Sequence, residues 1–347
     1  MPELDNQPPD VDVVIPVRDG ARFLPACLDS VIAQTHPPRA IIVVDDGSTD
    51  ATPQVLSEFA RRRPELQIIR SEPRGVSHAR NLALQASRAP FVAFLDADDV
   101  WEPSKLGRQL ALFEGPRPRL GFVYCAYRLI DESGRPVADE QILEPRARGC
   151  IFSELLVHGN IVSGSGSAVV VRRKVLDLVG GFDERLFLGE DWDLWIRLAS
   201  VSEIDFAPEP LVAVRVHDRS AQRRQRMGKA EVSLFQDLMV LDRWYGAENF
   251  PAGARARCRE KALNAATMRG RRLMFAALAD DWRFYLKLKQ CNSRIGRELF
   301  SGPVHFLCAM LVWRMLLGPS ISILKATLPP ARLEALRTRL RRRAKVG

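Results

Sequence analysis

Residues 11–50 read VDVVIPVRDG ARFLPACLDS VIAQTHPPRA IIVVDDGSTD, and this stretch decides the fold class. Two runs rich in β-branched residues, Val11–Val17 and Ala40–Val44, flank a segment from about Ala21 to Gln34 that has the apolar spacing of a helix. Short strands of about four to seven residues separated by helices of about a dozen indicate βαβ units and a parallel sheet. We therefore predict an α/β fold.

The same alternation continues outward from this stretch. Further elements are expected as a helix at Thr52–Arg63, a strand at Gln67–Arg70, a helix at Ser77–Ser87 and a strand at Phe91–Leu95. Because crossovers in such sheets are right-handed, the loops that follow the strands gather at one edge, where ligands bind. The acidic motifs described below fall on those loops.

The pattern changes further along the chain. We expect a strand in GFVYCAY (121–127), a turn at Asp131–Pro136, a strand at Ser167–Val171 and a helix at Arg173–Val179. Beyond Ser220 the sequence is helical in pattern and rich in Arg, Leu and Ala. Two regions are therefore predicted, an α/β domain over residues 1–220 and a helical region over 221–347.

Composition narrows the class of protein. The 347 residues are 46% hydrophobic and 27% charged, which is an ordinary globular balance, and the net charge of +9 calls for an anionic partner such as nucleic acid, nucleotide or anionic lipid. Clustered aspartates in the first half argue against a continuous nucleic-acid surface, so we expect no nucleic-acid partner. Six scattered cysteines and a polar, acidic N-terminus favour a reducing, cytoplasmic location.

Two acidic motifs follow predicted strands. Asp45 and Asp46 in IIVVDDGSTD (41–50) can accept hydrogen bonds from a nucleobase or a ribose, or they can simply cap a turn. In FVAFLDADDVW (91–101), Asp96, Asp98 and Asp99 come directly after a buried run. Carboxylates this close repel one another unless a cation neutralises them, and oxygen ligands suit Mg²⁺ or Mn²⁺ bridged to substrate phosphates. The alternative is a solvated acidic turn.

Three weaker signals complete the set. Gly75 permits a tight turn and Ser77 is a candidate cap for the helix that carries Arg80, in RGVSHARNLAL (74–84). Glu190, Asp191 and Asp193 begin a helix in GGFDERLFLGEDWDLWIRL (180–198), where acids either complement the helix dipole or serve as a general base. His217, at a predicted strand end, is a surface or structural side chain unless it reaches a site.

In this order, the motifs resemble family 2 glycosyltransferases with the GT-A fold. The resemblance covers about Val11 to Ser220 and implies a Rossmann-like mixed sheet with flanking helices. It also implies an enzyme of the hexosyltransferase type that transfers a sugar from a nucleotide-sugar donor to an acceptor hydroxyl with inversion. UDP-sugars are the default donor because this family often uses them.

Site roles follow from the resemblance. Asp46 resembles the base-binding aspartate, with Asp45 beside it and Arg80 supporting the nucleotide. Asp96 and Asp98 match the outer acids of the D-x-D motif, with Asp96 near the ribose and Asp98 on the Mn²⁺ or Mg²⁺ ion. The acidic pair of the acceptor site is matched by Glu190 and Asp191, which makes Asp191 the expected catalytic base. A C-terminal histidine that reaches the metal or the phosphates is matched by His217.

One position departs from the family. Many relatives have Tyr-Asn after the proline of the first strand, whereas this chain has Arg18 and Asp19 after Pro16-Val17. Backbone groups usually contact the nucleotide there, so the departure leaves activity intact and the base preference open.

The C-terminal region suggests a membrane surface. The most apolar run, Val304–Leu317, contains Arg314 and is shorter than the roughly 20 residues of a membrane span. A helix lying in the interface, followed by the Arg-rich Arg332–Lys345, fits peripheral binding to an anionic inner membrane face. A transmembrane helix and packing on the catalytic domain are the alternatives.

The sequence favours synthesis of cell-surface polysaccharide or glycolipid on a glycan or lipid-linked acceptor. A nucleotidyltransferase would want a Gly-rich, basic loop after the first strand, and Val17–Ala21 offers little of that. A catalytically inactive sugar-nucleotide binder or membrane scaffold is the remaining alternative, although such chains typically lack one of the acids present here. The sugar, the linkage, the acceptor and the oligomeric state are not specified by the sequence.

Overall fold

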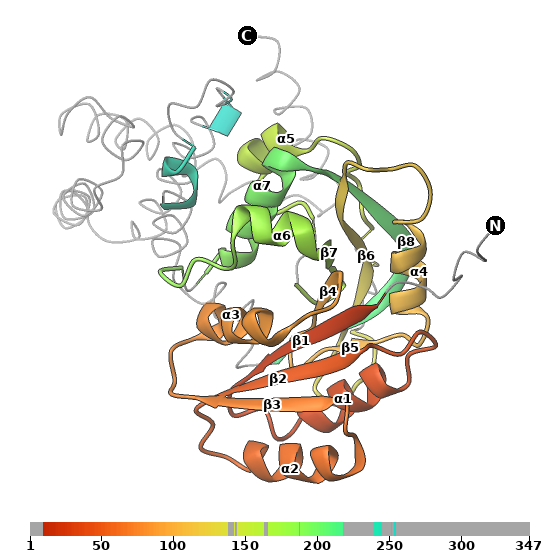
Figure 1. Ribbon diagram of the computed structural model, residues 1–347, viewed down its shortest axis with the longest axis vertical. Coiled ribbons are helices and arrows are strands. Elements are labelled where there is room, and N and C mark those ends of the chain that lie inside the picture. The colour runs from red at the N-terminus through yellow and green to blue at the C-terminus, as the bar shows by residue number, and fades with distance from the viewer. Residues whose placement is uncertain are drawn as a thin grey trace, which may run out of the picture. The chain divides into compact units, whose positions relative to one another are not determined.

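The computed structural model describes residues 10–137, 142, 144–162, 166–186, 188–217, 239–244, 251 and 253–254. The chain divides into two compact units, one of Met1–Lys229 with Ala247–Ala254 and one of Ala230–Gly246 with Arg255–Gly347. The first unit holds nearly all described residues and runs from red to green in Figure 1. The predicted boundary at residue 220, the apolar run Val304–Leu317 and the tail Arg332–Lys345 lie outside the described residues.

A single twisted sheet forms the centre of the first unit. Its strand order within the described part of the chain is β3-β2-β1-β4-β7-β6-β8-β5. The strands are β1 (Val11–Val17), β2 (Ala40–Asp46), β3 (Leu66–Ser71), β4 (Phe91–Phe94), β5 (Val100–Trp101), β6 (Leu120–Ile130), β7 (Val170–Arg172) and β8 (Glu203–Arg215).

The sheet is mixed, as the predicted fold class requires. Strands β1 to β4 are mutually parallel where they pair, with Val13 opposite Ile41 and Val11 opposite Phe91. Strand β7 lies between β4 and β6 and pairs antiparallel with both, and β6 pairs parallel with β8. The carboxyl ends of β1, β2 and β4 therefore meet at one edge, where Asp46 ends β2 and where the loops that carry Asp19 and Asp96 begin.

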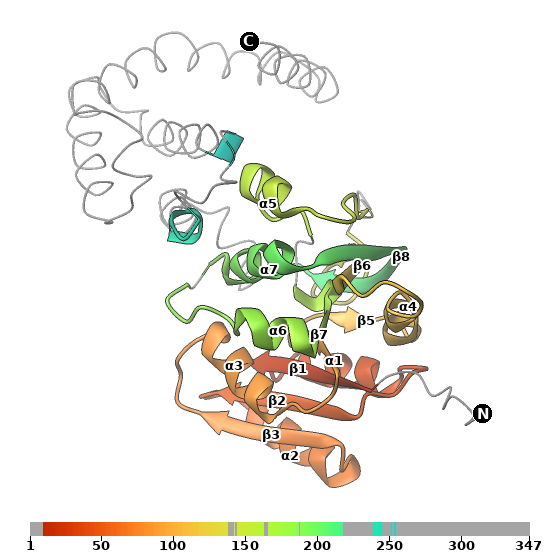
Figure 2. The same ribbon diagram turned by 45° about the horizontal axis from the view of Figure 1, so that its top comes forward.

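Helices cover both faces of this sheet (Figure 1). Helix α3 packs on β1 and β2, and α7 packs on β6, β8, α5 and α6; Figure 2 shows α5 beside α7. The helices are α1 (Leu24–Ile32), α2 (Thr52–Arg62), α3 (Val76–Ala86), α4 (Lys105–Ala111), α5 (Phe152–His158), α6 (Arg173–Val179) and α7 (Glu190–Val201), with a 3₁₀ turn η1 at Gly166–Ala168.

Strand periodicity divides the core into two layers. Val11, Val13 and Ile15 of β1 pack in one buried cluster with Leu24 and Leu28 of α1. Because successive side chains of a strand point to opposite faces, the intervening β1 residues face the α3 side of the sheet. All seven residues of β1 are buried, so the strand is covered on both faces, as its continuous apolar sequence predicts.

The structure corrects several boundaries. The first helix begins at Leu24 instead of Ala21, because the Gly20 carbonyl accepts hydrogen bonds from the amides of both Phe23 and Leu24 in a turn that precedes it. Ser167 lies in the 3₁₀ turn and not in a strand. Helices α4 and α5 and the short strand β5 were not predicted. Each of the two helices has only seven residues, which is too short to give a clear hydrophobic periodicity in the sequence.

Candidate active site

The acidic loop Asp96–Asp99 follows β4 and is held in place by its last member. The Asp96 amide donates to Ser167 Oγ at 3.0 Å, and that hydroxyl donates to Asp99 Oδ2 at 2.6 Å. Asp99 Oδ1 accepts from the Arg215 amide at 2.9 Å, at the end of β8. Asp99 is 2% exposed and has a structural role, whereas the side chains of Asp96 and Asp98 remain about one-third exposed, at 32% and 31%.

Negative charge is crowded in this loop. Burial, followed by the charges of Asp98 and Asp96, raises the pKa of the Asp99 carboxyl well above its usual range. Burial likewise raises the pKa of Asp96, although the Arg80 guanidinium opposes that shift. A cation bound at the exposed side of the loop would relieve this repulsion.

Asp98 and His217 form the pair best suited to hold such a cation. His217 Nε2 lies 2.8 Å from Asp98 Oδ2, the imidazole packs against the Phe23 ring at 5.0 Å, and Arg215 Nε donates to the Asp98 carbonyl at 2.9 Å. Adjacent ligands of an octahedral Mg²⁺ at about 2.1 Å are roughly 3 Å apart, so this spacing fits two neighbouring positions on one ion.

The donor set also limits how the ion would be held. Within the described ranges, no group of three or more His, Cys, Asp and Glu side chains is placed to hold a metal. Small divalent ions are commonly held by one or two protein ligands together with substrate phosphates and water. The pair of Asp98 and His217 fits that arrangement.

Arg80 of α3 connects this loop to α7. Its Nη2 donates to Asp96 Oδ1 at 2.7 Å and its Nη1 donates to Glu190 Oε1 at 3.0 Å, while the guanidinium lies over the Phe182 ring at 5.0 Å. Only 5% of the side chain is exposed. In this structure Arg80 therefore bridges the two acidic motifs, and its expected contact with a nucleotide stays a prediction.

Asp191 stands at the start of α7 beside that bridge. Its Oδ1 accepts from the Trp192 amide at 2.7 Å, and its Oδ2 accepts from Asn160 Nδ2 at 2.9 Å. Burial first, and then the charge of Glu190, raise the pKa of Asp191 to about 7. A carboxylate with a pKa near neutrality suits the general-base role that the resemblance implies for Asp191.

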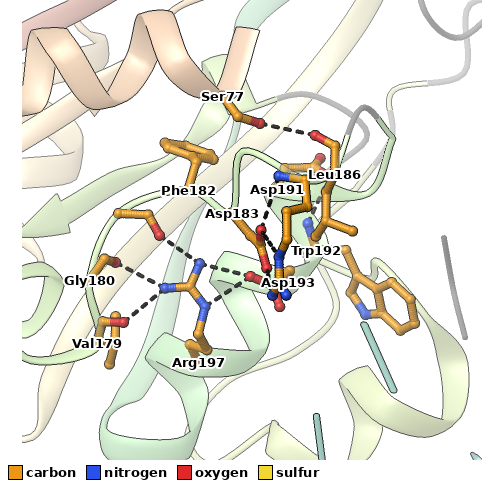
Figure 3. A network of polar contacts seen from close by, with 12 residues as sticks. Ser77, Val179, Gly180, Phe182, Asp183, Leu186, Asp191, Trp192, Asp193 and Arg197 are labelled. Atoms are coloured by element: carbon orange, nitrogen blue, oxygen red, sulfur yellow. Dashed lines mark hydrogen bonds and ion pairs between the residues drawn. The ribbon is translucent and has the colours of Figure 1, made fainter. Parts of the chain in front are cut away.

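The segment before α7 is fastened by a buried arginine (Figure 3). Arg197 donates to the carbonyls of Val179 and Gly180 at 2.9 Å each and forms an ion pair with Asp193 at 2.8 Å. The Ser77 hydroxyl donates to the Leu186 carbonyl at 3.2 Å, also drawn in Figure 3. Ser77 therefore does not cap α3, contrary to the prediction; it lies inside the first turn, and Gly75, at φ 101°, precedes the helix.

Asp45 and Asp46 end β2 as buried residues that hold neighbouring loops. Asp46 accepts the amides of Arg74 and Gly75 at 2.8 Å each, and Asp45 Oδ1 accepts the Ser48 amide at 2.8 Å. The turn-capping alternative therefore describes Asp45 well. Each carboxylate oxygen has two lone pairs, so Asp46 can accept a further hydrogen bond from a nucleobase. That contact stays a prediction.

Asp19, one of the two residues at which the sequence departs from the resembled family, ties two of the loops at this edge together. It adopts φ 50°, in the left-handed region that Asp and Asn tolerate. Its Oδ1 accepts the amides of Thr49 and Asp50 at 2.7 and 3.3 Å, and its own amide donates to Ser48 Oγ at 2.9 Å. The Asp19 side chain therefore fastens this loop to the loop that follows β2, while Arg18 is exposed beside it.

The predicted residues fall into connected groups. Asp96, Arg80 and Glu190 form one chain of ion pairs, Asp98 contacts His217, and Asp191 follows Glu190 directly. Asp45 and Asp46 make no contact with these groups that the structure describes. Sequence reasoning missed Asn160, Ser167 and Arg215, which carry no motif and reach the site only through tertiary contacts.

Comparison with known families shows what this part of the chain is similar to. Residues 12–180 match Glycosyl transferase family 2. Over these residues the chain is similar to family 2 glycosyltransferases. The matched residues include Asp19, Arg80 and the loop Asp96–Asp99, and they end before α7.

Curated relatives of the domain are glycosyltransferases. An uncharacterized glycosyltransferase of Rickettsia typhi is 29% identical over 214 residues, which cover 60% of this chain and 65% of that protein. The putative teichuronic acid biosynthesis glycosyltransferase TuaG of Bacillus subtilis is 32% identical over 135 residues, which cover 39% of this chain and 53% of TuaG. The matches thus span less than two thirds of these relatives' lengths.

Solved structures share the fold. S. aureus TarS 1–349 in complex with UDP-GlcNAc has a TM-score of 0.62 at 17% identity, with 88% of this chain and 92% of that chain covered. The mannosyltransferase PcManGT from Pyrobaculum calidifontis in complex with GDP-Man and Mn²⁺ has a TM-score of 0.54 at 20% identity, with 90% and 88% covered. These matches confirm the GT-A fold.

Among the described residues, none of the helices combines the length and apolar character that crossing a membrane requires.

Proposed function

We propose that this family 2 domain transfers a sugar from a nucleoside diphosphate sugar, UDP-linked by default, to an acceptor hydroxyl with inversion at the anomeric carbon. The observation that carries the proposal is the Arg80 bridge, which joins the acidic loop through Asp96 to α7 through Glu190, beside Asp191. The bridge thereby connects the candidate donor-side loop to the helix that carries the candidate base.

On the donor side, Asp98 and His217 would hold a Mn²⁺ or Mg²⁺ ion. When bound, that ion supplies Lewis-acid stabilisation of the charge that develops on the leaving diphosphate. Asp96 stays paired with Arg80 and faces the ribose. Support for a metal ion and a nucleotide-sugar donor comes from the Asp98–His217 spacing of 2.8 Å and from the complexes of TarS and PcManGT.

On the acceptor side, Asp191 would take the proton of the attacking hydroxyl. The acceptor oxygen forms a bond to the anomeric carbon as the bond from that carbon to the diphosphate breaks, and the proton moves to a carboxylate oxygen of Asp191. A base on α7, an element other than those that carry Asp98 and His217, suits this single displacement. General base catalysis of this kind contributes about 10² to 10⁴ in rate.

The acceptor class is proposed as a glycan or a lipid-linked glycan of cell-surface polysaccharide synthesis, at the inner face of the membrane. TuaG, a putative teichuronic acid biosynthesis glycosyltransferase, supports the polysaccharide part of this proposal. The basic residues of Arg332–Lys345 support the membrane part through their charge.

A screen of purified full-length protein against nucleotide sugars tests the proposed function. We expect one class of donor to release nucleoside diphosphate with Mn²⁺ or Mg²⁺ and to stop doing so in chelator. A glycan acceptor should accelerate this release. Binding of a nucleotide sugar without turnover in any metal would contradict transfer and favour the inactive binder.

A further inference from the structure

Asn160 contacts the candidate base from a separate element. Helix α5 ends at His158. The next residue, Gly159, has a φ of 86° and turns the chain so that Asn160 Nδ2 donates to Asp191 Oδ2 at 2.9 Å. Trp192 Nε1 donates to the Leu155 carbonyl at 3.0 Å, and both residues are buried, at 3% and 0% exposure. The two helices are thus locked together just where this contact forms.

Charged groups around Asp191 come from three elements. Glu190 precedes it on α7, Asp96 follows β4, and Arg80 projects from α3. The two acids disfavour a further negative charge, and the terminal nitrogens of Arg80 already donate to those same acids. The neutral amide of Asn160 therefore supplies a donor to the carboxylate without adding a charge to the site.

We propose that Asn160 is a positioning residue that orients the Asp191 carboxylate and favours its ionised, proton-accepting form. This inference rests on the proposed role of Asp191 as the base. A hydrogen bond to the charged form of an acid stabilises that form. Because a carboxylate oxygen has two lone pairs, Oδ2 can accept from Asn160 and still receive a proton from an acceptor hydroxyl.

The test compares pH–rate profiles of kcat for the wild type, Asn160→Ala and Asn160→Asp, with released nucleoside diphosphate as the readout. In Asn160→Ala the acidic limb should move upward by about 0.5 to 1 pH unit, which is the scale of one lost hydrogen bond. Its rate should then fall about three- to ten-fold on the acidic side and return close to the wild-type rate at alkaline pH. Asn160→Asp replaces the donor with a negative charge and should shift the limb further.

Ser153→Ala is the matched control, because Ser153 is an exposed residue of the same helix α5. Its profile should superimpose on that of the wild type. A rate lowered by one constant factor at every pH in Asn160→Ala would show a merely structural role and would overturn the proposal. If the midpoint of the acidic limb is the same in Asn160→Ala as in the wild type, the proposal is overturned as well. In either case, an active wild-type enzyme would leave the proposed function standing.

A second readout does not depend on turnover. Carbodiimide with an amine nucleophile modifies protonated carboxyls, and the pH midpoint of labelling at Asp191 is measured by peptide mass spectrometry. The midpoint should be higher in Asn160→Ala than in the wild type and in Ser153→Ala. If no donor is turned over, the proposed function fails while this measurement still decides the role of Asn160: equal midpoints overturn it.

Discussion

At the scale of single residues, Asp191 is the side chain on which transfer is expected to depend most. Asp191→Asn removes a proton acceptor and keeps the shape of the side chain. We expect kcat to fall by about 10²-fold or more, with the KM for the donor nearly unchanged. Steady-state kinetics with varied donor measure both quantities, and a variant that loses donor binding instead would place Asp191 in the nucleotide pocket.

The same substitution should stabilise the protein in a pH-dependent way. Burial and Glu190 raise the pKa of Asp191 from 3.8 to about 7. Between those values the unfolded state binds fewer protons than the folded state, so this group's contribution to the free energy of unfolding falls as pH rises. In thermal melts, the Tm of Asp191→Asn should exceed that of the wild type at pH 8 and equal it near pH 4. The same difference in Tm at both pH values would contradict this prediction.

Asp98 is expected to control metal binding. Asp98→Asn replaces an anionic ligand with a neutral one, so Mn²⁺ affinity in the presence of UDP should drop and transfer should nearly cease. Electron paramagnetic resonance of Mn²⁺ measures binding independently of activity. Glu58→Gln, an exposed acid of α2, is the control and should bind Mn²⁺ as the wild type does. Full wild-type activity in chelator would exclude the metal assignment.

At the scale of elements, α7 is placed by the buried pair of Arg197 and Asp193. Asp193 is 0% exposed and Arg197 also donates to the carbonyls of Val179, Gly180 and Gly181. Arg197→Met leaves a buried charge without its cation, a change that typically costs about 3 to 5 kcal/mol. Denaturant unfolding should show a loss of this size, and kcat should fall because Glu190 and Asp191 begin the same helix.

Arg62→Met supplies the matched control. Arg62 pairs with Glu58 on α2, and the two side chains are 74% and 58% exposed. Exposed ion pairs contribute about 0 to 1 kcal/mol, so this variant should unfold almost as the wild type does. Similar losses in both variants would show that the network around Arg197 has no special role in placing α7.

At the scale of the whole molecule, charge is expected to govern association with membranes. Seven basic residues and one acid, Glu334, lie between Arg332 and Lys345. Each basic residue near an anionic surface contributes about 1 kcal/mol, and the attraction fades within about 10 Å at 0.1 M salt. Full-length protein should therefore sediment with anionic vesicles at low salt, and removal of residues 332–347 should weaken this association and make it easier to wash off.

Neutral vesicles are the control for that measurement. If the full-length protein stays in the supernatant with anionic vesicles at low salt, the membrane proposal is wrong. The apolar run Val304–Leu317 would then be expected to pack on protein. Retention at high salt, by contrast, would indicate that this run inserts into the interface.

By itself, the sequence determined the α/β fold class, the strands β1, β2 and β4, and the acidic loops at their ends. These features are local: runs of β-branched residues and the residues that follow them can be identified without knowing what they contact. The helices α4 and α5 were missed because each buries only a few side chains over seven residues.

Only the tertiary structure decided what each acid contacts. Asp99 accepts a hydrogen bond from the Arg215 amide, which is 116 residues away in the sequence. Arg80 and Glu190 are 110 residues apart in the sequence, and Asn160 and Asp191 are 31 apart. Adjacent acids such as Asp98 and Asp99 are alike in the sequence, yet one is exposed beside His217 and the other is buried against β8. Burial and partner choice depend on long-range packing, and these two quantities set the pKa and the role of each carboxylate.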